Sequence, residues 1–263
     1  MIDTHCHFYL DQFNEDRGEL IRTIRNKGIE AVLIPGIDVL SSQRSIDLSL
    51  QYRGLLFTAV GIHPNYAGNA DPKGIYQLIN NHEDVIVALG EIGLDYYRDY
   101  SSPKEQQKVF EVMLAYANEF DLPICLHNRE ATAPLLATLD QWYKHDRLSQ
   151  PGGVFHAYDG SEDVAEWGKE HGFYFGIGGL ITYQKYKDLQ NIICAIGINN
   201  IVLETDAPYL TPVPLRGKRN SPLHLNIISQ KIAQLLNISR DKVIEITDQN
   251  ANRLFGFKRK MPN

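Results

Sequence analysis

Two histidines stand one residue apart at the start of the chain, in the stretch MIDTHCHFYL. Alternate residues of an extended strand point to the same side, so the side chains of His5 and His7 would lie next to each other. Neutral imidazoles are common metal ligands, and two on one side of a strand can bind a single ion. The same alternation turns Cys6 to the opposite face, where we expect a packed small side chain and no ligand.

Later apolar runs end on further side chains that can bind a metal, each in a separate run: Glu91, His127, His156 and Asp206. A carboxylate after a run as apolar as VIVALG must be paired or bound to a metal, because an isolated buried charge is very costly. For Glu91 the alternative is a salt bridge to Arg98 or Arg129. For Asp206 it is a turn or cap before Pro208. We favour the metal, because all these side chains end their runs in the same way.

The elements that must position these side chains are eight apolar runs that indicate strands, at 2–7, 30–37, 55–64, 85–95, 123–128, 152–160, 173–179 and 201–208. Several are nearly continuous in Val, Ile, Leu and Phe, as expected for strands covered on both faces. Helical patterns separate them. The clearest cover 103–121, 224–237 and a last segment that starts after Ser239 as N-cap and ends near Gly256.

This alternation of strands and helices predicts an α/β fold, a (β/α)8 TIM barrel formed by a single domain over 1–263. An open doubly wound sheet is the alternative. Function in such a barrel gathers at the C-terminal ends of the strands, so the ligands would meet at one mouth. A lone histidine is more often structural, and we expect no role in the site for His82, His145, His171 and His224.

Composition sets the broad class of protein. The chain has 32 acidic and 26 basic residues, and its net charge of −6 does not suggest a broad basic face for nucleic acid. Bound metal ions would then supply much of the positive charge near a phosphodiester. Three cysteines without a CxxC pair and the absence of a leader pattern indicate the cytoplasm. No run approaches the roughly 18 apolar residues of a membrane span. We expect a monomer with no obligate protein partner.

The motifs IDTHCH, GIHP, GEIGLDYYR, LPICLHNREA, FHAYDGS, GGLITY, LETDAPYLTP and RGKRNSP resemble, in order and spacing, the TatD family of deoxyribonuclease-like metal-dependent hydrolases. That family belongs to the amidohydrolase-like superfamily of barrels. The match runs from residue 2 to NANRLFGF near the C-terminus. The family's usual HCFSGS reads HAYDGS here, so Tyr158 and Asp159 depart from the pattern beside His156. The departure concerns substrate preference more than metal binding.

The resemblance implies a metal-dependent deoxyribonuclease that acts from the 3′ end of DNA and uses two divalent metal ions. The first ion would be held by His5, His7, Glu91 and Asp206. The second would be held by Glu91, His127 and His156, with Glu91 bridging the two. A donor set rich in imidazole favours zinc or manganese over magnesium, with which family members are commonly assayed, so zinc, manganese and magnesium are all candidates.

The expected mechanism follows from the two ions and two catalytic carboxylates, Glu91 and Asp206. Two ions about 3.5–4 Å apart activate a water and stabilise the oxygens of a displacement. Asp206 is the expected acceptor of the proton of the attacking water. Glu204, two residues earlier, is a weaker candidate for that role and could instead support the site.

Predicted substrate contacts are basic side chains near the same mouth: His63, Arg129, Arg216 and Lys218. His63 could donate to a phosphate oxygen, or it is a turn residue before Pro64. Arg129 pairs with phosphate or with a nearby carboxylate. Arg216 and Lys218 lie in the loop 208–222, which follows the eighth run and would flank the site.

Two functions compete on this pattern. The first is a DNA hydrolase. The second is a hydrolase of another bond on the same two-metal barrel, such as a small phosphoester, an amide or a lactone, because fold alone does not separate them. The basic loop and His63 favour phosphate, whereas the acidic net charge mildly favours a small substrate. A non-catalytic scaffold is disfavoured because no ligand position has been lost. The pattern does not decide between exonuclease and endonuclease action.

Overall fold

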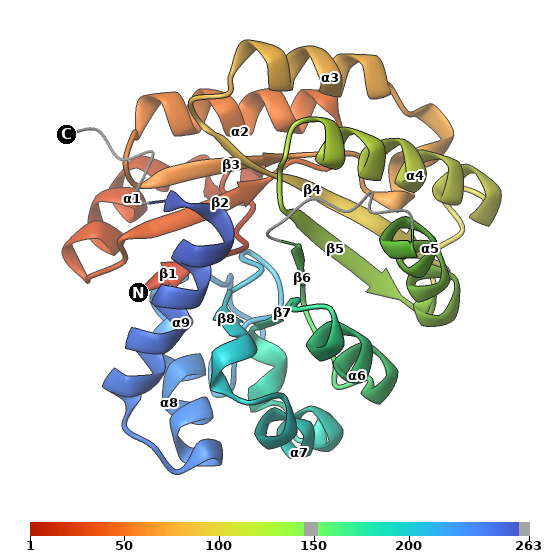
Figure 1. Cartoon of the computed structure of the whole chain (residues 1–263). Coiled ribbons are helices and arrows are strands. Elements are labelled where there is room, and N and C mark those ends of the chain that lie inside the picture. Colours follow the sequence, from red (N-terminus) through yellow and green to blue (C-terminus); the bar gives the residue numbers. More distant parts are fainter. Residues whose placement is uncertain (145–151, 258–263) are drawn as a thin grey trace.

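In the computed structural model, which describes residues 1–144 and 152–257, eight parallel strands are hydrogen-bonded in sequence order and curve into a barrel (Figure 1). The strands are β1 Ile2–Asp3, β2 Ala31–Pro35, β3 Leu56–Val60, β4 Ile86–Asp95, β5 Ile124–Arg129, β6 Gly153–Phe155, β7 Tyr174–Ile177 and β8 Ile201–Leu203. The predicted TIM barrel is confirmed, and the alternative of an open doubly wound sheet is wrong.

The barrel closes between β8 and β1 through the segments that follow these two short strands. The backbone N–H of Thr4 donates to Leu203 at 2.9 Å, and that of His7 donates to Ala207 at 2.8 Å. On the other side, Cys6 donates to Leu33 of β2 at 3.0 Å. The chain at 5–7 is therefore held between two neighbours although β1 itself ends at Asp3.

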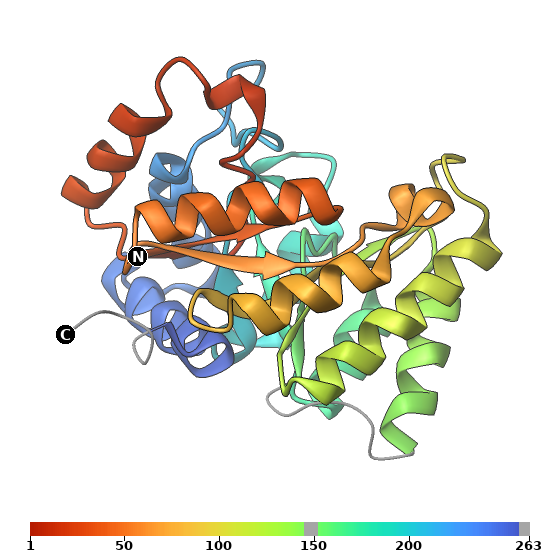
Figure 2. The ribbon, with the colours of Figure 1, turned by 90° about the horizontal axis from the view of Figure 1, so that it is seen from above.

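Helices cover the outside of the barrel, as the two views show (Figures 1 and 2). They are α1 Arg17–Asn26, α2 Val39–Gln51, α3 Pro72–Asn81, α4 Pro103–Glu119, α5 Thr132–Lys144, α6 Glu162–Glu170, α7 Lys187–Ile196, α8 Leu225–Leu236 and α9 Arg240–Phe255. The predicted caps of α9 are confirmed. The hydroxyl of Ser239 accepts the N–H of Lys242, and Gly256 ends the helix at φ +65°, a conformation that costs glycine little.

Two apolar cores follow from the alternation of side chains along the strands. One lies between sheet and helices and includes Ile34 and Leu126. The other fills the barrel with inward residues such as Leu33 and Phe57, and it continues into the end of α9. The Phe57 and Phe257 rings lie 4.8 Å apart, so the end of α9 closes the barrel at the strand starts. The opposite end, where the strands finish, is left for the site.

Seven of the eight strands are shorter than their apolar runs predict, and in three of them the run continues to a predicted metal ligand. The run 2–7 gives β1 Ile2–Asp3, the run 152–160 gives β6 Gly153–Phe155, and the run 201–208 gives β8 Ile201–Leu203. Most residues beyond each strand remain buried but leave the regular ladder, whereas Asp159 is exposed. Asp206 shows the reason, because its φ of +55° lies in the left-handed region and breaks strand geometry. His5, His7, His156 and Asp206 therefore stand just past strand ends, whereas Glu91 lies within β4 and His127 within β5, so these two do not end their strands as predicted.

Within residues 1–144 and 152–257, no helix has both the length and the apolar character needed to cross a membrane.

Candidate metal centre

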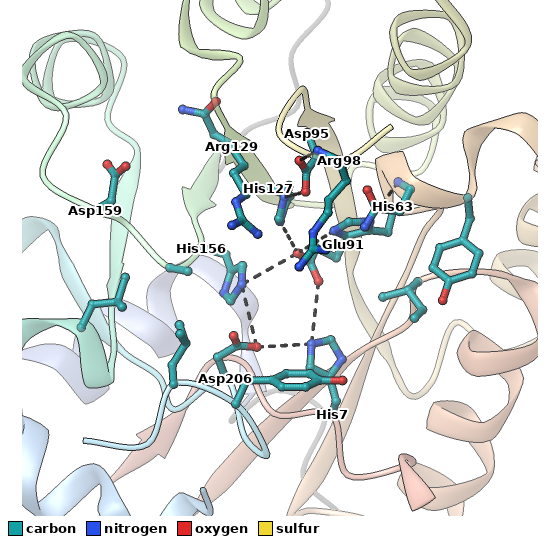
Figure 3. A pocket seen from close by; sticks show the side chains of 18 of the residues that line it. His7, His63, Glu91, Asp95, Arg98, His127, Arg129, His156, Asp159 and Asp206 are labelled. Carbon is teal, nitrogen blue, oxygen red and sulfur yellow. Dashed lines mark hydrogen bonds and ion pairs between the residues drawn. The ribbon is translucent and has the colours of Figure 1, made fainter. Parts of the chain in front are cut away.

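A cavity of about 580 Å³ opens at the C-terminal ends of the strands. Figure 3 shows imidazoles and carboxylates that converge on it from separate strands. Seven predicted site residues are among those that line it: His7, His63, Glu91, His127, Arg129, His156 and Asp206. His5 lies directly behind them, with its Nε2 atom 3.2 Å from that of His7. The barrel thus brings together side chains that are up to 201 positions apart in the sequence.

The histidine pair and Asp206 form one side of this cluster. Asp206 Oδ1 lies 3.4 Å from His7 Nε2 and 3.9 Å from His5 Nε2. The backbone N–H of Asp206 donates to the His5 carbonyl at 2.8 Å, which fixes the two segments against each other. Cys6 is fully buried on the other face, where burial raises the pKa of its thiol, as expected for a packed side chain.

Glu91, at the middle of β4, joins this side of the cluster to the other. Its Oε2 lies 3.4 Å from His5 Nε2, and its Oε1 lies 2.8 Å from His127 Nδ1 and 3.8 Å from His156 Nε2. Strand β4 lies close to β5 at this point because residue 93 is glycine. A Cβ atom there would collide with the carbonyl oxygen of His127. One carboxylate therefore faces two groups of imidazoles.

The pKa of each ionisable group in the cluster depends strongly on the charges of its neighbours. Burial opposes ionisation of Glu91, but His63, His156 and His127 hold its pKa well below the ordinary value. Burial likewise opposes the charge on His156, yet Glu204, Glu91 and Asp206 raise its pKa to about 10. Such a rise shows that the carboxylates create a site that favours positive charge.

Two further carboxylates hold the outer nitrogens of site histidines. Asp95 Oδ2 lies 3.2 Å from His127 Nε2, on the side of the ring opposite Glu91. Glu204, which is 1% exposed, places Oε1 3.1 Å from His156 Nδ1 and accepts the N–H of Ala157 at 2.7 Å. The Glu204–His156 contact has the distance of an ion pair without the alignment of a hydrogen bond. Carboxylates behind histidines are typical outer partners in metal centres.

His63 differs from the other histidines of the cavity. Its Nδ1 accepts the backbone N–H of Asn65 at 3.1 Å, so we assign the proton of the neutral ring to Nε2. Burial and the neighbouring His127 lower the His63 pKa to about 3, which agrees with a neutral ring. Nε2 lies 3.6 Å from Glu91 Oε1. His63 is therefore arranged as a hydrogen-bond donor into the cavity, although Asp95 and His127 lie near enough to form a ligand group with it.

The chemistry of these donors fits divalent cations. Nitrogen and oxygen atoms of His5, His7 and Asp206 lie within 4.8 Å of one another, as do those of His5, Glu91 and His156. The Nδ1 atom of His5 is buried without a hydrogen-bond partner in the described part of the chain, so its ring is oriented by packing and by the contacts of Nε2 with His7 and Glu91. Imidazole and carboxylate groups that face one point are the usual shell of zinc and related ions.

The other predicted contacts divide between cavity and surface. Arg129 lines the cavity together with His63, whereas Arg216 and Lys218 are not among its lining residues. The guanidinium of Arg216 stacks on the Tyr183 ring at 4.4 Å. A role of Arg216 and Lys218 in substrate binding stays a prediction.

The remaining histidines lie away from the cavity where they are described. His171 stacks on Trp167, His224 contacts Asn220, and His82 caps the end of α3. His145 lies outside the described residues.

Sequence reasoning missed two residues of the cavity as functional candidates, Asp95 and Arg98. A signal for Asp95 was available, because Glu91 and Asp95 are four positions apart on one strand and so share a face. Arg98 follows the strand within the motif GEIGLDYYR, and nothing in its spacing shows which way its side chain turns.

The sequence of this chain is similar to those of known proteins over nearly its whole length. The model of the family described as TatD related DNase matches residues 2–256. The chain belongs to this family. It is 33% identical over 257 residues to an uncharacterized metal-dependent hydrolase, YabD, of Bacillus subtilis, with 97% of this chain and 98% of that protein covered. It is 32% identical over 265 residues to the 3'-5' ssDNA/RNA exonuclease TatD of Escherichia coli, with 98% and 99% covered.

Solved structures agree with this membership. The TatD homologue YjjV of Escherichia coli superposes with a TM-score of 0.90 at 28% identity over 97% of this chain and 98% of that chain. An uncharacterized amidohydrolase from Saccharomyces cerevisiae superposes with a TM-score of 0.80 at 17% identity over 97% and 99%, and this shows a shared fold. The chain is a metal-dependent hydrolase of the TatD family with candidate metal sites of His, Glu and Asp.

Replacement of Glu204 by glutamine is expected to lower metal affinity about 10- to 100-fold, the usual cost of losing an outer partner of a metal ligand. Glutamine keeps the shape and the contact to Ala157 but removes the charge beside His156. Competition of Zn²⁺ between the protein and a chelating dye measures the change without an activity assay. The control is Glu166→Gln on the exposed face of α6. A Glu204→Gln variant with the affinity of the wild type would show that Glu204 does not hold His156.

Proposed function

We propose that this protein hydrolyses phosphodiester bonds of single-stranded DNA from the 3′ end, with two divalent metal ions. The observation that carries the proposal is the position of Glu91, whose two oxygens face separate groups of imidazoles at an open cavity. His5, His7, Glu91 and Asp206 would hold one ion, and Glu91, His127 and His156 the other. The similarity to the Escherichia coli 3'-5' ssDNA/RNA exonuclease TatD supports the choice of substrate.

The ions would supply Lewis acidity and a water of lowered pKa. The donors favour zinc or manganese, because imidazole suits these ions better than it suits magnesium. Phosphodiester hydrolysis adds water to phosphorus and breaks the bond to the 3′ oxygen. The products are a 5′-mononucleotide and a strand with a new 3′ hydroxyl.

Asp206 is the residue best placed to accept the proton of the attacking water. Its side chain is 13% exposed, against 5% for Glu91, so it meets the water of the cavity more openly. Burial raises its pKa, but the hydrogen bond from His7 and the nearby His156 and His5 lower the pKa below the ordinary value. Asp206 is therefore ionised at neutral pH, as a base must be.

The phosphate group would meet donors on the opposite side of the cavity. Nε2–H of His63 points toward Glu91 and can donate to a phosphate oxygen held there. Arg129 also lines the cavity and adds a charged donor for a phosphate group of the same strand. These contacts favour a phosphodiester over an amide or a lactone, because a charged phosphate oxygen forms stronger hydrogen bonds with these donors than a neutral carbonyl oxygen does.

The test is incubation of purified protein with linear single-stranded DNA labelled at its 5′ end, with Mn²⁺, Zn²⁺ or Mg²⁺ and with a chelator. A ladder that shortens from the 3′ end, and that stops when the chelator is added, is the expected result. Circular single-stranded DNA of the same sequence is the matched control and should stay intact, because it has no 3′ end. If metal-loaded protein leaves linear DNA intact but hydrolyses a small ester or amide, the proposal is wrong.

A further inference from the structure

Two arginines stand at the rim of the cavity, above the proposed metal ligands. Arg129 is the last residue of β5, and Arg98 lies three positions after the end of β4. Both line the cavity, and Figure 3 shows their side chains reaching toward its centre from the side of His127. Arg129 ends β5 and Arg98 follows the neighbouring strand β4, so the barrel sets the positions of both backbones.

Tyr97 brings the two guanidinium groups together. The Cζ atom of Arg129 lies 3.8 Å from the centroid of the Tyr97 ring, and that of Arg98 lies 5.4 Å from the same centroid. A guanidinium stacked on a ring keeps the N–H groups at its edge free to bind an anion in its plane. The ring orients the two arginines without consuming their donors.

Backbone hydrogen bonds hold this arrangement in place. Asp95 Oδ1 accepts the N–H groups of Tyr97 and Arg98, each at 3.0 Å, while Asp95 Oδ2 contacts His127. The N–H of Tyr96 donates to the carbonyl of Arg129 at 2.9 Å. The rim is therefore tied to the metal centre through Asp95, and it keeps a defined distance from it.

The two arginines carry a charge that no ion pair in the described part of the chain neutralises. Among residues 1–144 and 152–257, neither guanidinium has a carboxylate oxygen within the 4.0 Å of an ion pair. By contrast, Arg53 pairs with Asp84 at 2.8 Å, and Arg219 pairs with Asp16. Two like charges around one ring repel each other, and an anion bound between them relieves the repulsion. The forked donors match a phosphate group.

We propose that Arg98 and Arg129 bind the phosphate on the 5′ side of the scissile phosphate. The inference rests on the proposed function, because it assumes that the scissile phosphate lies at the metal ligands. A strand degraded from its 3′ end continues from that phosphate toward its 5′ end, where every nucleotide carries another charge. The substrate class is then a strand with two consecutive phosphates, and a small phosphodiester is a poor substrate.

The test compares thymidine dinucleotides that differ in one phosphate: TpT, 5′-phosphorylated pTpT and 3′-phosphorylated TpTp. We expect the wild type to have a KM for pTpT about 10- to 100-fold lower than for TpT, the effect of charged hydrogen bonds. Arg98→Gln and Arg129→Gln should each reduce this preference by about tenfold. Arg129→Lys should recover part of it, because lysine keeps the charge without the fork. Arg25→Gln, on the exposed C-terminal turn of α1, is the control and should keep the wild-type preference.

The outcomes separate the two proposals. If the metal-loaded wild type cleaves none of the dinucleotides or longer DNA, the nuclease proposal fails and the inference fails with it. If the wild type cleaves TpT and pTpT with equal KM, or prefers TpTp, the inference alone is wrong. Arginine variants that keep the wild-type ratio of KM values would also overturn it. Metal content and thermal unfolding of each variant, matched to the wild type, show that a lost preference is a local effect.

Discussion

The Glu91→Ala variant is expected to lose bound metal and phosphodiester hydrolysis together. Glu91 faces imidazoles on both sides, with His127 at 2.8 Å, His5 at 3.4 Å and His156 at 3.8 Å. Both proposed ligand groups use this carboxylate, so its removal weakens both. The loss of activity should exceed the roughly 10- to 100-fold that removal of an outer partner costs. Elemental analysis of metal per chain and an activity assay on the same preparation measure the two effects.

Two companion variants make this result specific. Glu91→Gln keeps the side-chain volume in a site where the Glu91 side chain is 5% exposed, so a defect in this variant reports lost charge and not a cavity. Glu111→Ala, on the exposed face of α4, controls for the loss of a carboxylate elsewhere. Two ions retained by Glu91→Ala at wild-type affinity would contradict the shared role of Glu91.

The barrel could be predicted because its signals are local. Each apolar run marks a strand by composition, and the caps at Ser239 and Gly256 follow from their own side chains or lack of one. The exact strand ends could not be predicted. The run 2–7 continues past Asp3 without a sequence signal of a strand end, and only the backbone pairing, reduced to an isolated bridge between Cys6 and Ala207, shows that the regular ladder has ended.

In the candidate site, too, the features with a local sequence signal could be predicted and those set by packing could not. The alternation of side chains along a strand predicted that His5 and His7 lie on one side of the chain. The convergence of strand ends in a barrel predicted that Glu91, His127 and Asp206 lie at one mouth. These residues do lie together, while their role as ligands stays a prediction. The contact between Glu204 and His156 could not be derived, because it depends on the packing of three neighbouring strand ends. It requires a glycine at 176 in β7, where a Cβ atom would collide with the carboxylate of Glu204.

The Asp206→Asn variant should keep most of its metal and lose about 10²- to 10⁴-fold in kcat, the usual contribution of a general base. Asparagine retains one oxygen toward His7 but cannot accept a proton at neutral pH. It also suits the backbone, because Asp206 has a φ of +55° and asparagine tolerates the left-handed region better than most residues. A loss of kcat in this variant would therefore report lost proton transfer, and not backbone strain or lost metal. The measurement is kcat at saturating DNA and saturating Mn²⁺, with metal content determined in parallel.

Comparison of Asp206→Asn with Glu204→Gln then decides which carboxylate takes the proton. Glu204 is 1% exposed and lies behind His156, so its loss should weaken metal binding and be largely rescued by excess metal. Asp206 meets the cavity directly, so its loss should persist at any metal concentration. If excess Mn²⁺ restores Asp206→Asn but not Glu204→Gln, the two roles are reversed and Glu204 is the base. Because both substitutions replace a carboxylate by its amide, a difference between them reflects position and not residue type.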